Sequence, residues 1–137
     1  MRYILLTLFL FTSLFSKEFD FQLKVQKVTK NTYMVEGKKE YFSAKNGGDI
    51  SNSSFIVTKE GVIVIDTGSS YFYGKQLKEE IKKITTQPIK YVINTHHHPD
   101  HFLGNSAFKG ATILASKYTK EYIENNGDAY IVNLINI

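Results

Sequence analysis

Apolar and polar residues alternate along the first part of the chain as they do in strands. Every second residue is apolar over residues 19–25, and the pattern resumes at residues 33–35 after the turn-like Lys30-Asn31. Period-two alternation places successive side chains on opposite faces of a strand. The stretch therefore predicts a β-hairpin with one face exposed to water. The punctuated Asn46-Gly47-Gly48-Asp49 that follows predicts a loop.

Two short apolar runs, Phe55 to Thr58 and Val62 to Ile65, predict the next strands. The second run is apolar at every position, which is typical of a strand covered on both faces. From residue 70 to residue 84, apolar residues recur at helical spacing with lysines and a glutamate on the other face. This pattern predicts an amphipathic helix that ends before Pro88.

A further strand is predicted over Ile89 to Asn94, followed by a loop, a short strand over residues 111–114 and the start of a helix over residues 116–124. From residue 62 onward the order is strand, helix, strand, loop, strand, helix. This order predicts an α/β layered fold.

Composition and charge fit one domain behind a targeting segment. The chain has 137 residues, 42% of them hydrophobic, and a net charge of +4. Its lysines are scattered, so we expect no nucleic-acid partner, which would need a clustered basic stripe. Met1-Arg2 precedes an apolar run from Tyr3 to Phe15, the layout of a secretory signal peptide cut after Ser16. The run is too short for a stable membrane span, although an uncleaved anchor stays an alternative. We expect residues 1–16 to be the signal, residues 17–137 the domain, and the protein to be periplasmic or secreted.

All four histidines of the chain lie in the stretch "THHHPDH", and the chain has no cysteine. If the backbone leaves its strand extended, His96 and His98 project the same way and can grip one cation, with Asp100 and His101 slightly further on. Imidazole nitrogens and a carboxylate are ligands that Zn²⁺ prefers in hydrolytic sites. Pro99 favours extended geometry at the residue before it. The pattern predicts a metal pair.

The same residues admit other interpretations. A histidine run can bind metal adventitiously on a surface, but such a run has no reason to include an aspartate or to follow a buried strand. Ser69 and Ser70 lack a histidine outside the cluster to activate them, so helix capping is favoured over nucleophilic catalysis. Residues 71–73 are aromatic and are expected in the core rather than at a substrate mouth.

The motif "THHHPDH" resembles the His-x-His-x-Asp-His signature of the metallo-β-lactamase superfamily. Asp66-Thr67-Gly68 resembles the aspartate loop that precedes this signature in the family. The resemblance implies an αββα sandwich with a zinc site at one end, and a hydrolase in which zinc-activated hydroxide attacks an ester, thioester, lactone or lactam. The continuation through Gly104-Asn105 is similar to exported members related to quinoprotein-linked and sulfur-oxidation hydrolases.

The same resemblance implies roles for single residues. His96 and His98 would bind the first zinc ion, and Asp100 and His101 the second. Asp100 would also act in catalysis by orienting the attacking hydroxide. Asp66 would stand behind the metal ligands, and the middle histidine, His97, would point elsewhere.

The resemblance covers only the first half of the family fold. No histidine or cysteine follows His101, and Asp128 lies too close to the motif in sequence to match the bridging ligand of the family. The sequence also stops within an apolar segment. We therefore expect an αββα sandwich truncated to its N-terminal half, with weak zinc binding, little turnover of a small-molecule substrate, and a need for a complementing C-terminal half or self-association. Two alternatives stay open: a non-catalytic metal-binding module and one half of a split hydrolase.

Overall fold

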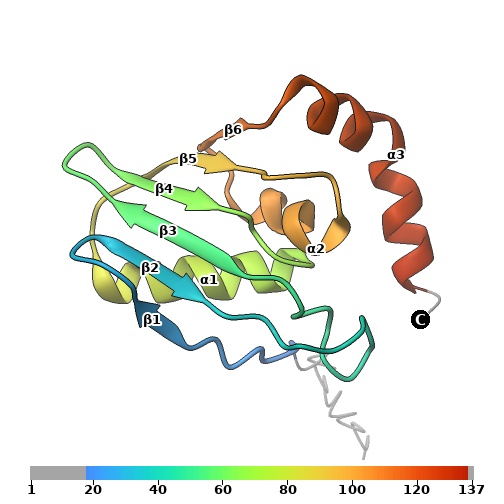
Figure 1. Cartoon of the computed structure of the whole chain (residues 1–137), viewed down its shortest axis with the longest axis horizontal. Coiled ribbons are helices and arrows are strands. Elements are labelled where there is room, and N and C mark those ends of the chain that lie inside the picture. The colour runs from blue at the N-terminus through green and yellow to red at the C-terminus, as the bar shows by residue number, and fades with distance from the viewer. Residues whose placement is uncertain (1–17, 136–137) are drawn as a thin grey trace, which may run out of the picture.

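The computed structural model describes residues 18–135, which form a mixed β-sheet with helices around it (Figure 1). The predicted signal peptide therefore lies outside the described residues, and no helix within them is long and apolar enough to cross a membrane. The elements in chain order are β1 (Val25–Lys27), β2 (Thr32–Val35), β3 (Ser53–Val57), β4 (Val62–Ile65), α1 (Tyr71–Ile84), β5 (Ile89–Ile93), α2 (Pro99–Phe102), the 3-10 helix η1 (Leu103–Ala107), β6 (Thr112–Leu114) and α3 (Lys117–Ile135).

The six strands lie side by side in sequence order. β1 to β4 pair with antiparallel neighbours, whereas β4, β5 and β6 are parallel, joined by α1 between the first two and by α2 and η1 between the last two. The predicted α/β layered class is confirmed. Because β4 and β5 are parallel, their carboxyl ends meet at one edge of the sheet, which is where open α/β folds build their sites.

The predicted hairpin forms, but its first strand is shorter than the alternation indicated. Residues 18–24 are irregular, with a left-handed backbone at Gln22. The amide of Gln76 in α1 takes the backbone hydrogen bonds that a strand would have made: it accepts from the N–H of Phe21 at 2.9 Å and donates to the carbonyl of Phe19 at 2.6 Å. Phe21 is buried beside the ring of Tyr73 at a centroid distance of 5.1 Å.

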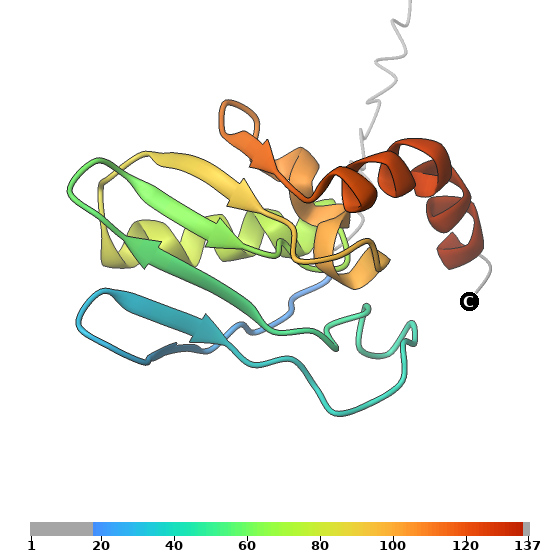
Figure 2. The same cartoon turned by 45° about the horizontal axis from the view of Figure 1, so that its top comes forward.

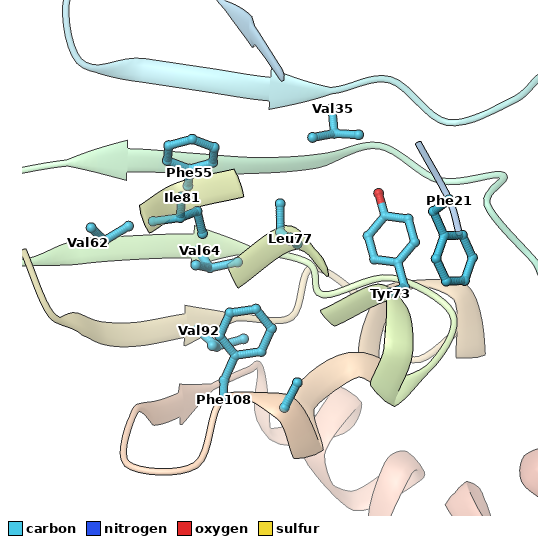
Figure 3. Close-up of a cluster of buried hydrophobic side chains, with 11 residues drawn as sticks. Phe21, Val35, Phe55, Val62, Val64, Tyr73, Leu77, Ile81, Val92 and Phe108 are labelled. Carbon is cyan, nitrogen blue, oxygen red and sulfur yellow. The ribbon is translucent and has the colours of Figure 1, made fainter. Parts of the chain in front are cut away.

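The core lies between α1 and one face of the sheet (Figure 3). Its fully buried members include the following residues of α1 and of the central strands: Leu77, Ile81, Phe55, Val62, Val64 and Val92. Burial of each large apolar side chain contributes roughly 1.5–3 kcal/mol. Tyr73 also belongs to this core, and its burial raises the pKa of its hydroxyl to about 12.

The residues around the start of α1 divide between core and surface. Of the three aromatic residues at 71–73, the core expectation holds for Tyr73, whereas Tyr71 and Phe72 are exposed. The capping expectation holds for Ser70, whose side chain accepts from the N–H of Tyr73 at 3.1 Å. Ser69 is not the cap, since its hydroxyl donates to the carbonyl of Gly47.

The opposite face of the sheet is only partly covered by the described residues. On β4, Val62 and Val64 are fully buried, but Ile63 and Ile65 are half-buried. Tyr91 of β5 pairs with Ile63 on the same face and is 41% exposed. The expectation that β4 is covered on both faces is therefore wrong for this chain, because α1 packs on one face of the sheet alone (Figure 2).

A close backbone approach fixes the segment after the histidine motif against the end of β4. The N–H of Gly104 in η1 donates to the carbonyl of Gly68 at 3.1 Å, and a Cβ at residue 104 would collide with the carbonyl oxygen of Thr67. The collision involves backbone, which cannot move aside as a side chain can. Glycine is therefore required here for the two segments to touch.

Gly104→Ala should destabilise the protein by about 1–3 kcal/mol, as overpacking does in close-packed interiors. Gly127→Ala is the matched control, because a Cβ there meets nothing closer than 4.0 Å in the middle of α3. Alanine is the better helix former, so the control should be neutral or stabilising. Urea unfolding midpoints of the two variants measure the difference, and equal midpoints would contradict the close approach.

Candidate metal centre

The site begins with Asp66, the residue after β4. Its backbone N–H donates to the carbonyl of Ile93 at the end of β5, at 2.9 Å, and its φ angle is +57°. This left-handed conformation is tolerated by aspartate better than by most residues other than glycine. It turns the chain at the sheet edge, and the side chain of Asp66 is almost fully buried.

The carboxylate of Asp66 accepts hydrogen bonds from two segments that follow β5. The N–H of Thr95 donates to Oδ1 at 2.8 Å, and the Thr95 hydroxyl lies 2.7 Å from Oδ2. Nδ1 of His101 lies 2.8 Å from the same Oδ2. One buried carboxylate therefore fixes both ends of the histidine motif.

The motif leaves β5 extended but does not stay extended. His98 has φ −70° and ψ 143°, as expected before a proline, and Pro99 then starts the short helix α2. The N–H of His101 donates to the carbonyl of His98 at 3.0 Å. The extended geometry expected throughout the motif is therefore wrong: His98 is extended, but the chain bends at His96 and His97. The helix begins at Pro99 because proline at the first position of a helix is pre-organised for helical geometry.

Three of the four imidazole rings converge. The ring centroid of His96 lies 4.7 Å from that of His98 and 4.0 Å from that of His101. His97 turns to a different neighbour: its ring stacks on Tyr122 of α3 at a centroid distance of 4.0 Å. The middle histidine thus joins the motif to α3, which lies beyond the end of β5 in Figure 1.

His101 and Asp100 face each other, with Nε2 and Oδ2 3.4 Å apart. Burial alone would lower the pKa of His101, but its hydrogen bonds to Asp100 and Asp66 raise it to about 9. Burial alone would raise the pKa of Asp100, but the hydrogen bond from His101 lowers it. The pKa of His96 is lowered by burial and by the other two imidazoles. Without metal, His101 is therefore charged at neutral pH, with Nδ1 facing Asp66 and Nε2 facing Asp100.

The donor types suit a zinc ion, and Nε2 of His101 lies close to Oδ2 of Asp100. Nevertheless, among residues 18–135 no group of three or more histidine, cysteine, aspartate or glutamate side chains is arranged to hold a metal ion. The donors lie near one another without forming such a group: the ring of His96 neighbours those of His98 and His101, and Asp100 faces His101.

Four polar residues that support the motif were missed from the sequence. Asn94 and Asn105 form a reciprocal amide pair at 2.7 Å and 3.2 Å, and Thr67 donates to Asn105 at 2.9 Å. The carbonyl of His101 accepts from the N–H of Thr67 at 2.9 Å. Thr95, between Asp66 and His96, is the fourth. Their signal was weak, since asparagine and threonine beside a motif are also ordinary turn residues.

Comparison with known proteins identifies the family. The model of the metallo-beta-lactamase superfamily matches residues 46–132. The metallo-beta-lactamase IND-1 of Chryseobacterium indologenes is 32% identical over 106 residues, which is 76% of this chain and 41% of that protein. A linear primary-alkylsulfatase of Pseudomonas sp. (strain ATCC 19151) is 43% identical over 69 residues, 50% of this chain and 13% of that protein. The chain belongs to the metallo-beta-lactamase superfamily.

Solved structures have the same fold. A metallo-beta-lactamase from Pontibacter korlensis superposes with a TM-score of 0.66 and 28% identity, over 77% of this chain and 49% of that one. The metallo-beta-lactamase FIM-1 from Pseudomonas aeruginosa, in a mono-zinc form, gives a TM-score of 0.62 at 20% identity, over 77% and 46% of the two chains. The chain thus spans about half the length of these relatives, and the fold is that of their matching half.

The paired carboxylates around His101 make the stability of the metal-free protein depend on pH. A pKa raised to about 9 from an unfolded value of about 6.5 contributes stability that is fully present below pH 6.5. This contribution is lost as pH rises through 9. The free energy of unfolding in the presence of a chelator should fall across this window, and His101→Gln should flatten the fall. An equal fall in both proteins would contradict the assignment.

Proposed function

We propose that this chain carries half of the zinc site of a metallo-beta-lactamase-type hydrolase that acts on a small ester, thioester, lactone, lactam or related substrate. One observation carries the proposal: the buried Asp66 holds the motif at the sheet edge so that His96, His98 and His101 converge beside Asp100. An adventitious surface run of histidines has no buried carboxylate behind it.

We assign His96 and His98 to one zinc ion, and Asp100 and His101 to a second. A catalytic zinc ion usually takes three protein ligands, so each ion would need at least one more donor from outside this pair. The proton on Nε2 of His101, which faces Asp100, would leave when zinc binds, because metal ligands must be deprotonated.

Bound zinc would supply Lewis acidity that makes a water molecule acidic near neutral pH. The chain's own residues would do the positioning. Asp100, with its side chain 16% exposed, can accept a hydrogen bond from the attacking water. Asp66 keeps the ring of His101 in place through Nδ1, so that only Nε2 can serve the metal.

The names of the relatives suggest more than one substrate class for this chain. IND-1 is named for a β-lactamase activity and the Pseudomonas relative for an alkylsulfatase activity. The two names differ in substrate class, and one fold can host several activities. A primary alkyl sulfate therefore belongs in the substrate panel beside lactams, lactones and thioesters.

A second half of the fold would account for both the missing zinc donors and the partly covered face of the sheet. The apolar row on that face includes Ile63, Ile65, Tyr91 and Ile93. We propose that this face packs against a complementary second sheet, as the αββα sandwich implied by the family resemblance would require. Where that half is absent, the same face would drive self-association.

The specific observation behind a second candidate function is that the side chains of His96, His98, Asp100 and His101 gather near the end of β5, whereas no group among the described residues binds a substrate. A module that captures Zn²⁺ without catalysis uses the same imidazole and carboxylate donors, with further protein ligands in place of the open water position of a catalytic ion. Zinc binding without turnover of any substrate in the panel, in the presence of a complementary half, would favour this alternative over the hydrolase.

Adjacent histidines provide a matched test of the zinc assignment. His98→Ala should weaken zinc binding by at least about tenfold. Even the loss of a residue that only hydrogen-bonds to a metal ligand reduces metal affinity by about that factor. His97→Phe should leave zinc binding near wild type, because His97 stacks on Tyr122 and phenylalanine keeps that contact. Competition with a chromophoric chelator measures both affinities. Equal losses in the two variants would indicate an adventitious histidine run, and the proposed site would be wrong.

The uncovered face predicts self-association of the isolated chain. Ile63→Thr with Ile65→Thr should shift the protein toward monomer in analytical ultracentrifugation and reduce binding of a hydrophobic dye. Val28→Thr is the control, because Val28 is 58% exposed but lies in the β1–β2 connection. A wild-type chain that stays monomeric at high concentration and binds no dye would contradict the proposal.

A further inference from the structure

Thr95 lies between the buried aspartate and the first histidine of the motif. Its hydroxyl oxygen is 2.7 Å from Oδ2 of Asp66 and 3.0 Å from Nδ1 of His96. Its backbone N–H separately donates to Oδ1 of Asp66 at 2.8 Å, so the backbone of residue 95 is held whether or not the hydroxyl is present.

The hydrogen atoms in this chain of contacts can be counted. A threonine hydroxyl has one hydrogen to donate, and a carboxylate has none. If the hydroxyl donated to His96, two oxygen atoms would face each other at 2.7 Å with no hydrogen between them, which is repulsive. A hydrogen bond to a charged acceptor is also about twice as strong as one between neutral groups. The Thr95 hydroxyl must therefore donate to Asp66.

The direction of that hydrogen bond determines which ring nitrogen of His96 carries the hydrogen. With its hydrogen committed to Asp66, the Thr95 oxygen can only accept from His96, so Nδ1 of His96 must carry the hydrogen. In a neutral imidazole the other nitrogen, Nε2, then holds the lone pair. His101 is arranged in the same sense without a relay, since its Nδ1 donates directly to Oδ2 of Asp66.

We propose that Thr95 is a positioning residue that extends the influence of Asp66 to His96 and fixes the imidazole tautomer whose Nε2 is free to bind zinc. The proposal rests on the proposed function in one respect, that Nε2 of His96 is a zinc donor. The tautomer itself is a property of the metal-free chain.

The hydroxyl of Thr95 can be tested separately from its backbone. Residue 95 is exposed and follows the end of β5, and its backbone bond to Asp66 persists in any variant. Thr95→Val keeps the branched shape but removes the hydroxyl, whereas Thr95→Ser keeps the hydroxyl and removes the methyl group. The two variants separate hydrogen bonding from packing.

Long-range ¹H–¹⁵N NMR of the histidine rings in the metal-free protein reads the tautomer directly. His96 should be in the Nδ1–H form in wild type and in Thr95→Ser, and should lose this preference in Thr95→Val. The ring signals of His101 serve as the internal control and should not change in any variant. Wild-type His96 in the Nε2–H form, or an unchanged tautomer in Thr95→Val, would overturn the proposal.

Zinc affinity provides the second measurement. Thr95→Val should bind zinc about 10–100-fold more weakly than wild type, the usual cost of losing a group that orients a ligand, and Thr95→Ser should restore most of the loss. Equal affinities of wild type and Thr95→Val would contradict the relay. If wild type binds no zinc at all, the proposed function fails, while the NMR result still decides whether Thr95 sets the tautomer. Should Thr95→Val fail to fold, Thr95→Ala gives the same two readouts.

Discussion

The buried carboxylate of Asp66 is the constraint on which the site depends. It stands at the end of β4 in a left-handed conformation and accepts hydrogen bonds from the backbone and side chain of Thr95 and from the ring of His101. A buried carboxylate without partners costs several kcal/mol, so these contacts are mutually necessary. The parallel pairing of β4 with β5 brings the two partners to the same edge of the sheet. The fold thus places the histidine motif, and Asp66 orients it.

Around this carboxylate, the polar network continues through the backbone. Thr67 and Asn94 both donate to the carbonyl of His101, and Asn94 is paired in turn with Asn105. The network holds a short helix and a 3-10 helix in place although neither is long enough to be stable alone. The segment from α2 to η1 is therefore fixed against the ends of β4 and β5. In the proposed function, the incomplete set of zinc donors and the half-covered sheet face are the two features that call for groups outside residues 18–135.

Much of the fold could be predicted from the sequence, because the periodic apolar positions of its strands and of α1 include the residues that are buried in the core. The bounds of β4 are those of its apolar run, and Ser70 caps α1 as expected. The alternation at residues 19–23 failed as evidence for a strand, because a side chain of α1 satisfied the backbone there instead of a neighbouring strand. Local pattern cannot distinguish these two partners for the same amide groups.

The site was predicted in part. The clustering of His96, His98, Asp100 and His101, and the place of Asp66 behind them, followed from the motif and its resemblance, and the structure brings these side chains together. The helical turn at Asp100 was not foreseen, and neither was Thr95, because a hydroxyl that relays a hydrogen bond leaves no signature in a linear sequence. Such contacts become visible only when segments about 30 residues apart are placed side by side.

The central claim is that Asp66 organises the metal donors, and the zinc affinity of Asp66→Asn tests it most directly. Asparagine keeps the size of the side chain but cannot accept all three hydrogen bonds. Asp49→Asn is the control, a second aspartate that is buried but outside these contacts. The account predicts about 10–100-fold weaker zinc binding in Asp66→Asn and little change in Asp49→Asn, with both variants folded. Wild-type zinc affinity in a folded Asp66→Asn protein would contradict it.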